Sequence, residues 1–426
     1  MNTGFLLGSA LLVMLLLPAR ALLAAEPPAH CDSGNGGITL PAGFCATVFA
    51  DNLGTARNLT VAPDGDVYVA LFSPESGGGI VALRPGAEGR AAEIKRFGEY
   101  GGTCIRVHAG YLYFATPTEV LRYKLVPGQL LPDTTAEVVV SGFPEQDEHA
   151  AKTFAFDAAG HIYVNVGAPS NACQREDRRR GSPGIRPCPY LTEHGGIWEF
   201  NADRINQHFP QDGRRYATGI RNGLAIAWNA AVQQLYDLQM GRDQLYGNWP
   251  ELYTPQQSAE LPAEEFLRVS RGDNFGWPYC YYDQLQHKRV LAPEYGGNGK
   301  QVGECSQYAK PILAFPGHWA PLALTFYTGD AFPSAYRGGA FIAFHGSWNR
   351  APLPQAGYQV VFVPFKGALP AGGYQVFAGD FAGVSPLASP DDAHFRPSGV
   401  AEGPDGALYI SDSQHGRIWR IVYQRR

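Results

Sequence analysis

The sequence has few charged residues and no dense cluster of positive charge. Of its 426 residues, 17% are charged, the formal net charge is −5, and no block of five basic residues occurs. Nucleic acids and anionic membrane surfaces attract concentrated positive charge. The composition therefore gives no reason to expect either as a partner.

Long helix-forming runs and a haem attachment motif are also lacking. Runs of Ala, Leu, Glu and Lys are scarce, whereas glycine (51) and proline (33) are abundant. These two residues mark turns, so many turns are predicted in one large all-β domain or two ordinary domains. Because no Cys-x-x-Cys-His motif exists, electrons from any redox reaction would leave through a separate carrier.

The N-terminal segment 1–25 is expected to be a secretory signal peptide. An apolar run over 5–17 is followed by Pro18 and small residues up to Ala25. The run is short for a membrane span, and no other segment is suited to cross a bilayer, although an uncleaved anchor is the alternative. We therefore expect a periplasmic or secreted protein whose mature form, 26–426, has no membrane span.

The spacing of the cysteines is consistent with an exported protein. Their spacing predicts disulfides that close three local loops, Cys31–Cys45, Cys173–Cys188 and Cys280–Cys305, in irregular segments where chain entropy is large. Cys104 is left over in a strand-like run and is expected to be a buried free thiol.

A tight turn followed by alternating apolar residues recurs six times along the chain. Asp-Gly or Gly-Gly before such alternation is typical of hairpins, and repeats of several short strands indicate propeller blades. We predict an all-β, six-bladed propeller as a single domain, in preference to a two-sheet sandwich. The repeats lie at 63–69, 109–114, 158–164, 231–236, 337–342 and 404–410.

Two stretches, 173–215 and 243–310, are rich in Pro, Gly, Tyr and Cys. No linker-like composition separates them from the rest, so they are predicted to be long ordered loops on one face. In a propeller such loops would wall the mouth of the central channel, where ligands bind.

Polar side chains stand at the ends of several predicted strands. The strand 341–344 runs into Trp348, Asn349 and Arg350, which offer a stacking surface and a carboxylate clamp, unless this is an ordinary surface turn. His149 precedes the predicted strand 153–157. Its acidic neighbours favour a raised imidazole pKa and a general-base role, with a solvated loop histidine as the alternative.

Arginines recur at such positions. Arg221 and Asn222 precede the predicted strand 224–228 and could hold an anion and a carbonyl, or form a turn salt bridge. Arg350 and Arg396 also lie at the entrance or exit of blade strands. Three arginines aimed at one channel would repel one another, so they predict a multiply anionic ligand.

The turn Met240-Gly-Arg-Asp follows the predicted strand 234–239. Its exposed backbone carbonyls suit a hard cation such as calcium, although the chain has no EF-hand-like loop.

Five motifs resemble the sorbosone-dehydrogenase-type branch of quinoprotein sugar dehydrogenases and, more distantly, soluble quinoprotein glucose dehydrogenase. The resemblance implies a six-bladed propeller that binds pyrroloquinoline quinone (PQQ) and calcium and oxidises a sugar or sugar aldehyde. The motifs are Gly-Ile-Arg-Asn (219–222), Gly-Arg-Asp-Gln-Leu (241–245), Phe-Gly-Trp-Pro-Tyr-Cys-Tyr-Tyr-Asp (275–283), His-Gly-Ser-Trp-Asn-Arg (345–350) and Gly-Pro-Asp-Gly-Ala-Leu-Tyr-Ile-Ser-Asp (403–412).

The resemblance implies two catalytic residues. His149 would accept the hydroxyl proton as hydride moves to the quinone, and Arg221 would polarise the quinone oxygen. The glucose enzymes have an aspartate after the strand that follows the histidine, whereas 167–170 contains no carboxylate. Two outcomes are therefore open: Glu148 or Asp147 orients the ring instead, or the base is weaker than in the glucose enzymes.

The resemblance also implies binding residues. The carbonyls of Gly241 and Arg242 would contribute to calcium, and Glu148 and Trp348 would lie on the substrate side. A small sugar and a separate acceptor, such as a cytochrome c or a quinone, are the expected partners. The residues expected to hold PQQ are Arg221, Asn222, His318, Asn349, Arg350 and Arg396.

Two other functions stay open. A calcium-dependent lactonase can also be a six-bladed propeller, but it needs several acidic and Asn side chains on one metal, whereas this chain carries arginines. A propeller that binds a ligand without catalysis is the third hypothesis.

Overall fold

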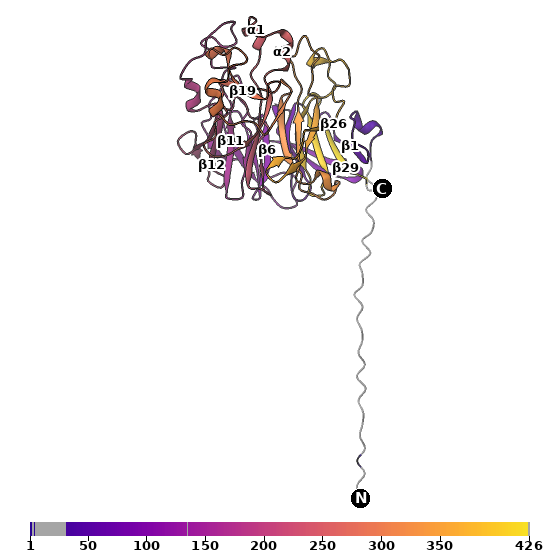
Figure 1. Cartoon of the computed structure of the whole chain (residues 1–426). Helices are drawn as coiled ribbons and strands as arrows, with labels where there is room; N and C mark the ends of the chain where they lie inside the picture. Colours follow the sequence, from indigo (N-terminus) through magenta and orange to yellow (C-terminus); the bar gives the residue numbers. More distant parts are fainter. Residues whose placement is uncertain (2–3, 5–30, 134, 425–426) are drawn as a thin grey trace.

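The computed structural model describes residues 31–133 and 135–424, together with Met1 and Gly4, and shows sheets arranged around a central axis (Figure 1). The expected signal peptide otherwise lies outside the described residues. Within them the strands form six mainly antiparallel blades, which confirms the predicted fold class. No helix in this part of the chain is long and apolar enough to span a bilayer.

The first three blades follow one another along the chain. The first holds β2 (Ala56–Val61), β3 (Val67–Glu75), β4 (Gly78–Pro85) and β5 (Ala91–Phe97). The second holds β6 (Cys104–His108), β7 (Tyr111–Ala115), β8 (Val120–Lys124) and β9 (Glu137–Ser141), with β13 (Gln207–His208) parallel to β9. The third holds β10 (Phe154–Phe156), β11 (His161–Val166), β12 (Gly196–Asn201) and β14 (Arg214–Thr218).

The remaining blades complete the ring. The fourth holds β15 (Ala227–Asn229), β16 (Gln234–Gln239), β17 (Glu264–Val269) and β20 (Leu313–Phe315). The fifth holds β21 (Pro321–Phe326), β22 (Ala340–Phe344), β23 (Gln359–Val363) and β26 (Gln375–Ala378). The sixth holds β27 (Pro397–Glu402), β28 (Leu408–Asp412), β29 (Ile418–Tyr423) and β1 (Phe44–Ala50).

Each of the six sequence repeats forms the turn into the second strand of its blade, namely β3, β7, β11, β16, β22 and β28. Gly65 and Gly406 take φ values of 94° and 76° in two of these turns, a backbone region that favours glycine. The first strand of every blade contacts the first strands of the neighbouring blades and lines the axis. The stretch 341–344, predicted to be a strand, belongs to β22, which is second in its sheet.

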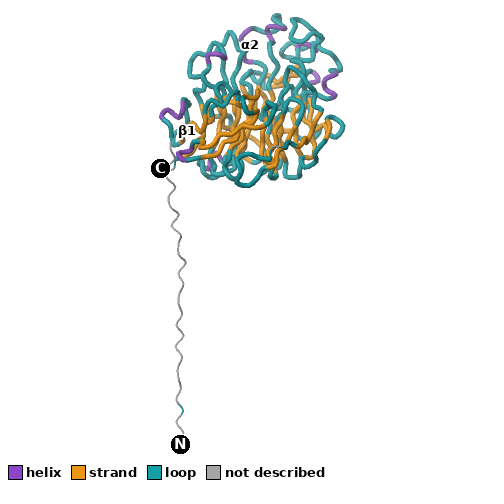
Figure 2. Tube along the Cα trace, turned by 180° about the vertical axis from the view of Figure 1, so that it is seen from behind, coloured by secondary structure: helices purple, strands orange, loops and turns teal. Residues whose placement is uncertain are grey.

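Long loops cover one end of the ring, as predicted (Figure 2). They carry α1 (Leu245–Asn248), α2 (Pro255–Glu260) and the hairpin of β18 (Cys280–Asp283) and β19 (Lys288–Leu291). The predicted loop boundaries were too wide, because apolar alternation continues inside both stretches: 173–215 contains β12 and β13, and 243–310 contains β17.

Small elements complete the described chain. A short hairpin joins β24 (Phe365–Lys366) to β25 (Leu369–Pro370). The 3₁₀ turns are Ser33–Gly36, Ala87–Gly89, Pro189–Thr192, Pro293–Tyr295, Gly303–Gln307, Ser334–Tyr336 and Pro390–Asp392.

The predicted cysteine pairing is confirmed. Disulfides join Cys31 to Cys45, Cys173 to Cys188 and Cys280 to Cys305. The last two lie in the loop layer, where they cross-link segments that carry little secondary structure. Cys104 is a buried free thiol.

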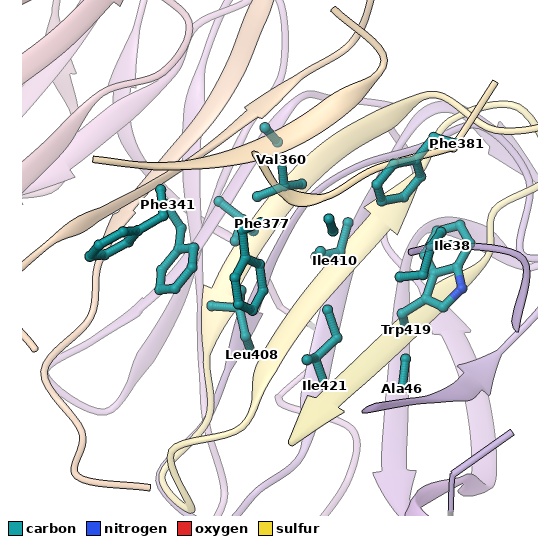
Figure 3. Close-up of a cluster of buried hydrophobic side chains, with 14 of the residues drawn as sticks. Ile38, Ala46, Phe341, Val360, Phe377, Phe381, Leu408, Ile410, Trp419 and Ile421 are labelled. Carbon is teal, nitrogen blue, oxygen red and sulfur yellow. The ribbon is translucent and has the colours of Figure 1, made fainter. Parts of the chain in front are cut away.

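The N-terminal strand closes the ring. β1 pairs antiparallel with β29, with Phe44 opposite Tyr423, so the first and last described strands share one sheet. Buried side chains of the fifth and sixth blades pack beneath this junction (Figure 3). The Phe44 ring meets Phe332 and Phe377 edge-on, with centroids 4.8 and 5.0 Å apart. Closure therefore depends on apolar packing as well as on strand pairing.

Phe44→Ala is expected to lower the free energy of unfolding by about 3–5 kcal/mol, because it removes a buried ring and leaves a cavity at the junction. Guanidinium denaturation followed by tryptophan fluorescence measures the change. The control is Leu285→Ala, at a side chain that is 60% exposed, where an effect within about 0.5 kcal/mol is expected. Similar losses in the two variants would contradict a closing role for Phe44.

Candidate active site

A cavity of about 280 Å³ opens among the strand ends on the loop-covered side of the ring. Its wall comes from the third, fourth and fifth blades and from the Cys173–Cys188 loop. Most of the lining side chains are polar or charged, as in a site for a small polar molecule. They are Glu148, His149, Arg178, Arg221, Met240, Gly241, Asp243, Glu264, His318, Ala320, Trp348 and Asn349.

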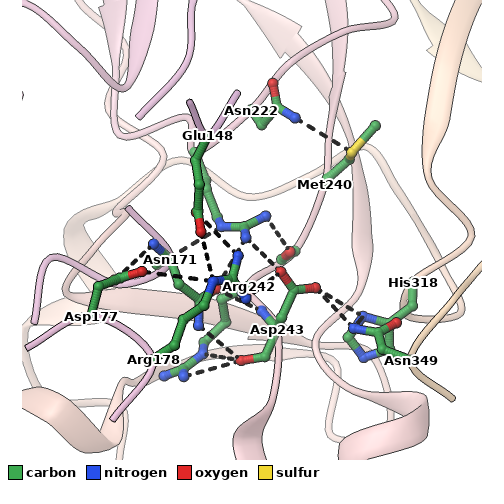
Figure 4. A network of polar contacts seen from close by, with 12 residues as sticks. Glu148, Asn171, Asp177, Arg178, Asn222, Met240, Arg242, Asp243, His318 and Asn349 are labelled. Atoms are coloured by element: carbon green, nitrogen blue, oxygen red, sulfur yellow. Dashed lines mark hydrogen bonds and ion pairs between the residues drawn. The ribbon is translucent and has the colours of Figure 1, made fainter. Parts of the chain in front are cut away.

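The carboxylate of Asp243 connects three sides of this cavity (Figure 4). Its Oδ2 accepts hydrogen bonds from Nη2 of Arg221 at 2.7 Å and from Nη1 of Arg178 at 3.1 Å. Its Oδ1 accepts from Nδ2 of Asn349 at 3.0 Å. Burial opposes ionisation, but the positive charge of Arg221 and further cationic neighbours hold the pKa of Asp243 well below its usual range. Asp243 is therefore an ionised carboxylate buried between two guanidinium groups.

Arg221 is buried and donates from all three nitrogens of its guanidinium group. Besides Asp243, it donates to the backbone and side-chain oxygens of Asn171 at 3.2 and 3.0 Å and to the Gly241 carbonyl at 2.9 Å. Four contacts from two segments of the chain fix the plane of the group, as a preorganised electrostatic residue requires. The Gly241 carbonyl, a predicted calcium ligand, already accepts one of these hydrogen bonds.

His149 lies in the cavity wall with its backbone in the left-handed region, at φ 54°. Its Nδ1 is 2.5 Å from the carbonyl oxygen of Ala168. A carbonyl only accepts, so Nδ1 carries the proton and Nε2 keeps its lone pair. Nε2 of Gln146 donates to the carbonyls of Glu148, His149 and Gly167 at 2.6, 3.2 and 3.2 Å and braces this turn.

The expectations about the charge and orientation of His149 were wrong. Loss of hydration, and then the positive charge of Arg221, lower the pKa of His149 to about 3. Neither predicted carboxylate orients the ring, because Asp147 is exposed and Glu148 is engaged elsewhere. The carbonyl of Ala168 serves instead.

Glu148 pairs with Arg178, a residue that the sequence interpretation missed. Nε and Nη2 of Arg178 donate to the two oxygens of Glu148 at 2.7 and 3.1 Å. The third contact of this arginine is Asp243, so the disulfide-closed loop is tied to both sides of the cavity. A run of three arginines, 178–180, within a short Cys-to-Cys loop was the available signal.

His318 and Asn349 lie together in the wall, where Nδ2 of Asn349 is 3.4 Å from Nδ1 of His318. Nε2 of His318 lies 2.8 Å from the carbonyl of Ser258. Asn222 adjoins the wall, with Nδ2 3.5 Å from the sulfur of Met240. The buried Oδ1 atoms of Asn222 and Asn349 have no partner among the described residues, so both are free to accept from a ligand.

The three predicted arginines do not converge on this cavity. Arg350 lies behind the wall, where it donates to three backbone carbonyls and pairs with Glu260 at 2.7 Å. Arg396 donates to the carbonyls of His345 and Gly346. Neither lines the cavity, because nearby oxygens hold each group elsewhere. The side chain of Arg242 is likewise buried against Glu294.

Glu264, like Asp243, is a cavity residue that the sequence interpretation missed. It is only 2% exposed, and its two oxygens accept backbone N–H bonds from Ala320 and Gly241 at 3.2 and 3.1 Å. Burial raises its pKa to about 8. At neutral pH the positive charges of Arg178 and Arg221 thus balance Glu148 and Asp243, while Glu264 is neutral.

The fold is a six-bladed propeller, and one cavity at its strand ends contains a balanced network of charges and a neutral histidine. Such a protein is suited to bind and act on a small polar ligand. The chain matches the TrAA12-like family over residues 38–424 and belongs to that family.

Known proteins agree with this assignment. A pyrroloquinoline quinone-dependent pyranose dehydrogenase of Coprinopsis cinerea is 27% identical over 279 residues, which is 57% of this chain and 36% of that protein. The chain thus spans about a third of that curated relative. The holo PQQ domain of a pyranose dehydrogenase from Coprinopsis cinerea has a TM-score of 0.73 at 20% identity, covering 90% of this chain and 97% of that one. The calcium structure of the Trichoderma reesei family AA12 enzyme has a TM-score of 0.72 at 19% identity, covering 91% and 97%. At these identities the structures establish the shared fold.

Glu264→Gln is expected to change how stability depends on pH. The folded pKa is about 8, whereas an unfolded glutamate titrates near ~4.3, so the folded state retains a proton that the unfolded state has lost. The retained proton stabilises the folded state fully below about pH 4. This stabilisation is lost as the pH rises toward 8, which lowers the free energy of unfolding by about 3–5 kcal/mol. Glutamine does not titrate, so the loss should be absent from the variant.

Denaturant unfolding of the metal-free protein at pH 5, 6.5 and 8 measures this difference. Glu251→Gln, at an exposed glutamate, controls for the loss of one surface charge. Parallel pH profiles for wild type and Glu264→Gln would show that Glu264 is ionised across this range.

Proposed function

We propose that this protein is a PQQ- and calcium-dependent dehydrogenase that oxidises a sugar or sugar aldehyde of the aldose or sorbosone type. One observation carries the proposal. His149 presents a neutral Nε2 at a cavity that also contains the fixed guanidinium group of Arg221. A base beside a rigid positive charge suits removal of a hydroxyl proton during oxidation at carbon.

The cavity suits the cofactor when calcium accompanies it. PQQ has three carboxylates and an ortho-quinone. Because the charges of the cavity wall already balance one another, binding of this anion requires added positive charge. The buried, unpartnered Oδ1 atoms of Asn222 and Asn349 can accept from an N–H or O–H group or contact a cation. Arg221, Asn222, His318 and Asn349 would hold the cofactor, which when bound supplies a two-electron acceptor.

His149 would act through Nε2. Its Nδ1–H bond to Ala168 sets the tautomer, and the Gln146 bonds hold the turn, so the ring does not need to reorient before it accepts a proton. The low pKa leaves Nε2 unprotonated at physiological pH and makes His149 a weaker base than an ordinary histidine. Arg221 would stabilise the negative charge that develops on the oxygen facing it, without moving from its contacts with Asn171 and Asp243.

Calcium is proposed near the turn after β16. The carbonyls of Gly241 and Arg242 remain the proposed ligands, and Gly241 lies in the cavity wall. The carboxyl group of Glu264 accepts from the Gly241 N–H, so a nearby cation would favour its ionised form.

The substrate would enter beside Trp348, whose side chain is 55% exposed at the rim. An exposed indole offers a flat apolar face for a sugar ring. Glu148, which also lines the cavity, could accept hydrogen bonds from sugar hydroxyls while paired with Arg178. The named pyranose dehydrogenase relative supports a sugar as substrate. Electrons would pass to a separate cytochrome c or quinone.

Export to the periplasm or the medium is proposed on the basis of the three disulfides and the N-terminal sequence, because disulfides persist in oxidising compartments. The lactonase alternative has less support. Among the described residues, no group of three or more His, Cys, Asp or Glu side chains is placed to hold a metal.

The proposal is tested by reconstitution and by His149→Asn. Asparagine tolerates the left-handed backbone at this position but supplies no base. With PQQ and calcium, wild type should reduce an acceptor dye in the presence of aldoses or sorbosone, and the variant should lose about 10²–10⁴-fold in kcat. Its affinity for PQQ, measured by calorimetry, should stay close to that of wild type.

His394→Asn, at an exposed histidine, is the matched control and should keep full activity. Failure of wild type to bind PQQ with calcium present would overturn the proposed function. Full activity of His149→Asn would show that His149 is not the general base, and it would leave the cofactor assignment intact.

A further inference from the structure

A second cavity lies between the first and second blades, apart from the candidate active site. It has a volume of about 370 Å³, which is within the range of sites for small molecules. None of its lining residues lines the cavity around Asp243. They include Phe97 at the end of β5, Leu121 and Tyr123 of β8, and Gly98, Glu99 and Tyr100 of the connection from β5 to β6.

Backbone hydrogen bonds hold this connection against the first blade. The N–H group of Gly79 donates to the carbonyl of Gly98 at 2.9 Å, and the N–H group of Gly102 donates to the carbonyl of Leu71 at 2.8 Å. The part of the connection that lines the cavity is thus held at both ends before a ligand binds, which lowers the entropy cost of binding.

The hydroxyl group of Tyr123 is a buried polar group in this cavity. The residue is only 4% exposed, and its ring meets Phe97 edge-on with centroids 5.4 Å apart. The hydroxyl has no hydrogen bond with any described residue. Burial, followed by Glu99 and Tyr100, raises the pKa of Tyr123, so the neutral hydroxyl can donate as well as accept. A buried polar group of this kind requires a partner from outside the protein.

Two exposed side chains complete the cavity. Tyr100 is 55% exposed, so its ring is open to a ligand. Glu99 has no hydrogen bond or ion pair within the part of the chain that the structure describes, so its oxygens can accept. A pyranose needs this combination, because its C–H face packs on an aromatic ring while its hydroxyl groups form hydrogen bonds with a carboxylate and a phenol.

A cation is the alternative ligand for aromatic rings beside a carboxylate. Sites of that kind surround the cation with the faces of several rings. Here Phe97 and Tyr123 are buried and pack against each other, so Tyr100 is the ring that stays open to a ligand. This arrangement favours a sugar ring over a cation.

The connection continues from the cavity toward the channel mouth. In the inner strand β2, the N–H group of Asn58 donates to the carbonyl of Thr103 at 3.1 Å. Phe72, a second exposed ring, adjoins the same connection, since its neighbour Leu71 accepts the hydrogen bond from Gly102. A chain of sugar units that starts in the cavity therefore has an aromatic surface along the way to the mouth.

We propose that this cavity is a second saccharide-binding site, which holds a pyranose unit of an oligosaccharide. The ring of Tyr100 would pack on the apolar face of the sugar, and Tyr123 and Glu99 would form hydrogen bonds with its hydroxyl groups. Saccharide binding here does not depend on the redox reaction. Its use in catalysis, to hold a substrate chain whose end reaches the catalytic cavity, rests on the function proposed above.

Calorimetric titration of the cofactor-free protein with cellotetraose, maltotetraose and xylotetraose tests the site. Wild type should bind at least one of them, and Tyr100→Ala should weaken that binding about 3–10-fold. Tyr123→Phe keeps the packed ring but removes the hydroxyl, so it should weaken binding about 2–10-fold without lowering the unfolding temperature. Tyr246→Ala, at an exposed tyrosine of α1, is the matched control and should bind as wild type does.

Kinetics with PQQ and calcium bound test the link to catalysis. Tyr100→Ala should raise KM for the tetrasaccharide about 3–10-fold, and it should leave kcat and the KM for glucose unchanged, because the lost contact is remote from the reacting carbon. An unchanged KM for the tetrasaccharide would overturn this link.

Binding of none of the three tetrasaccharides by wild type would overturn the site, as would equal affinities of wild type, Tyr100→Ala and Tyr123→Phe. Tyr100-dependent binding of tetramethylammonium in place of the saccharides would identify a cation site instead. Failure of wild type to bind PQQ, together with Tyr100-dependent binding of a tetrasaccharide, would overturn the proposed function and leave the saccharide site standing.

Discussion

The buried carboxylate of Asp243 is the contact on which the candidate site depends. It holds Arg221 and Arg178 from two different segments and Asn349 from a third, so one side chain joins the third, fourth and fifth blades. A buried ion pair adds little net stability, but removal of one partner leaves an uncompensated charge. Asp243 therefore matters chiefly because it fixes positions: with it in place, Arg221 points at the cavity in one orientation.

The two halves of the channel mouth differ in how their charges are matched. Around Asp243 every guanidinium group has a carboxylate partner, which makes that half rigid and electrically balanced. On the other side, Arg57 stacks on the Phe72 ring and Arg396 donates to the carbonyls of His345 and Gly346, and neither forms an ion pair with a described residue.

His149 shows why the chemistry of a site is hard to read from neighbours in the chain. The acidic residues beside it predicted a raised pKa, yet Glu148 turns toward Arg178 and Asp147 toward solvent. The ring instead faces a carbonyl that follows β11 and is influenced by a guanidinium group that lies between the third and fourth blades. Long-range contacts thus reverse the sign of the shift that the local sequence indicates.

The sequence by itself determined the six blades, the three disulfides and the position of the loop layer, because turn chemistry, strand periodicity and cysteine spacing are local properties. It also singled out most of the cavity wall, since polar residues at strand ends meet at one end of a propeller. Only the tertiary structure decided which arginines face the cavity, that Arg178, Asp243 and Glu264 belong to it, and that Arg57 has no ion-pair partner among the described residues. These outcomes depend on which charges become neighbours across blades and on how much water each loses, and neither is encoded in adjacent residues.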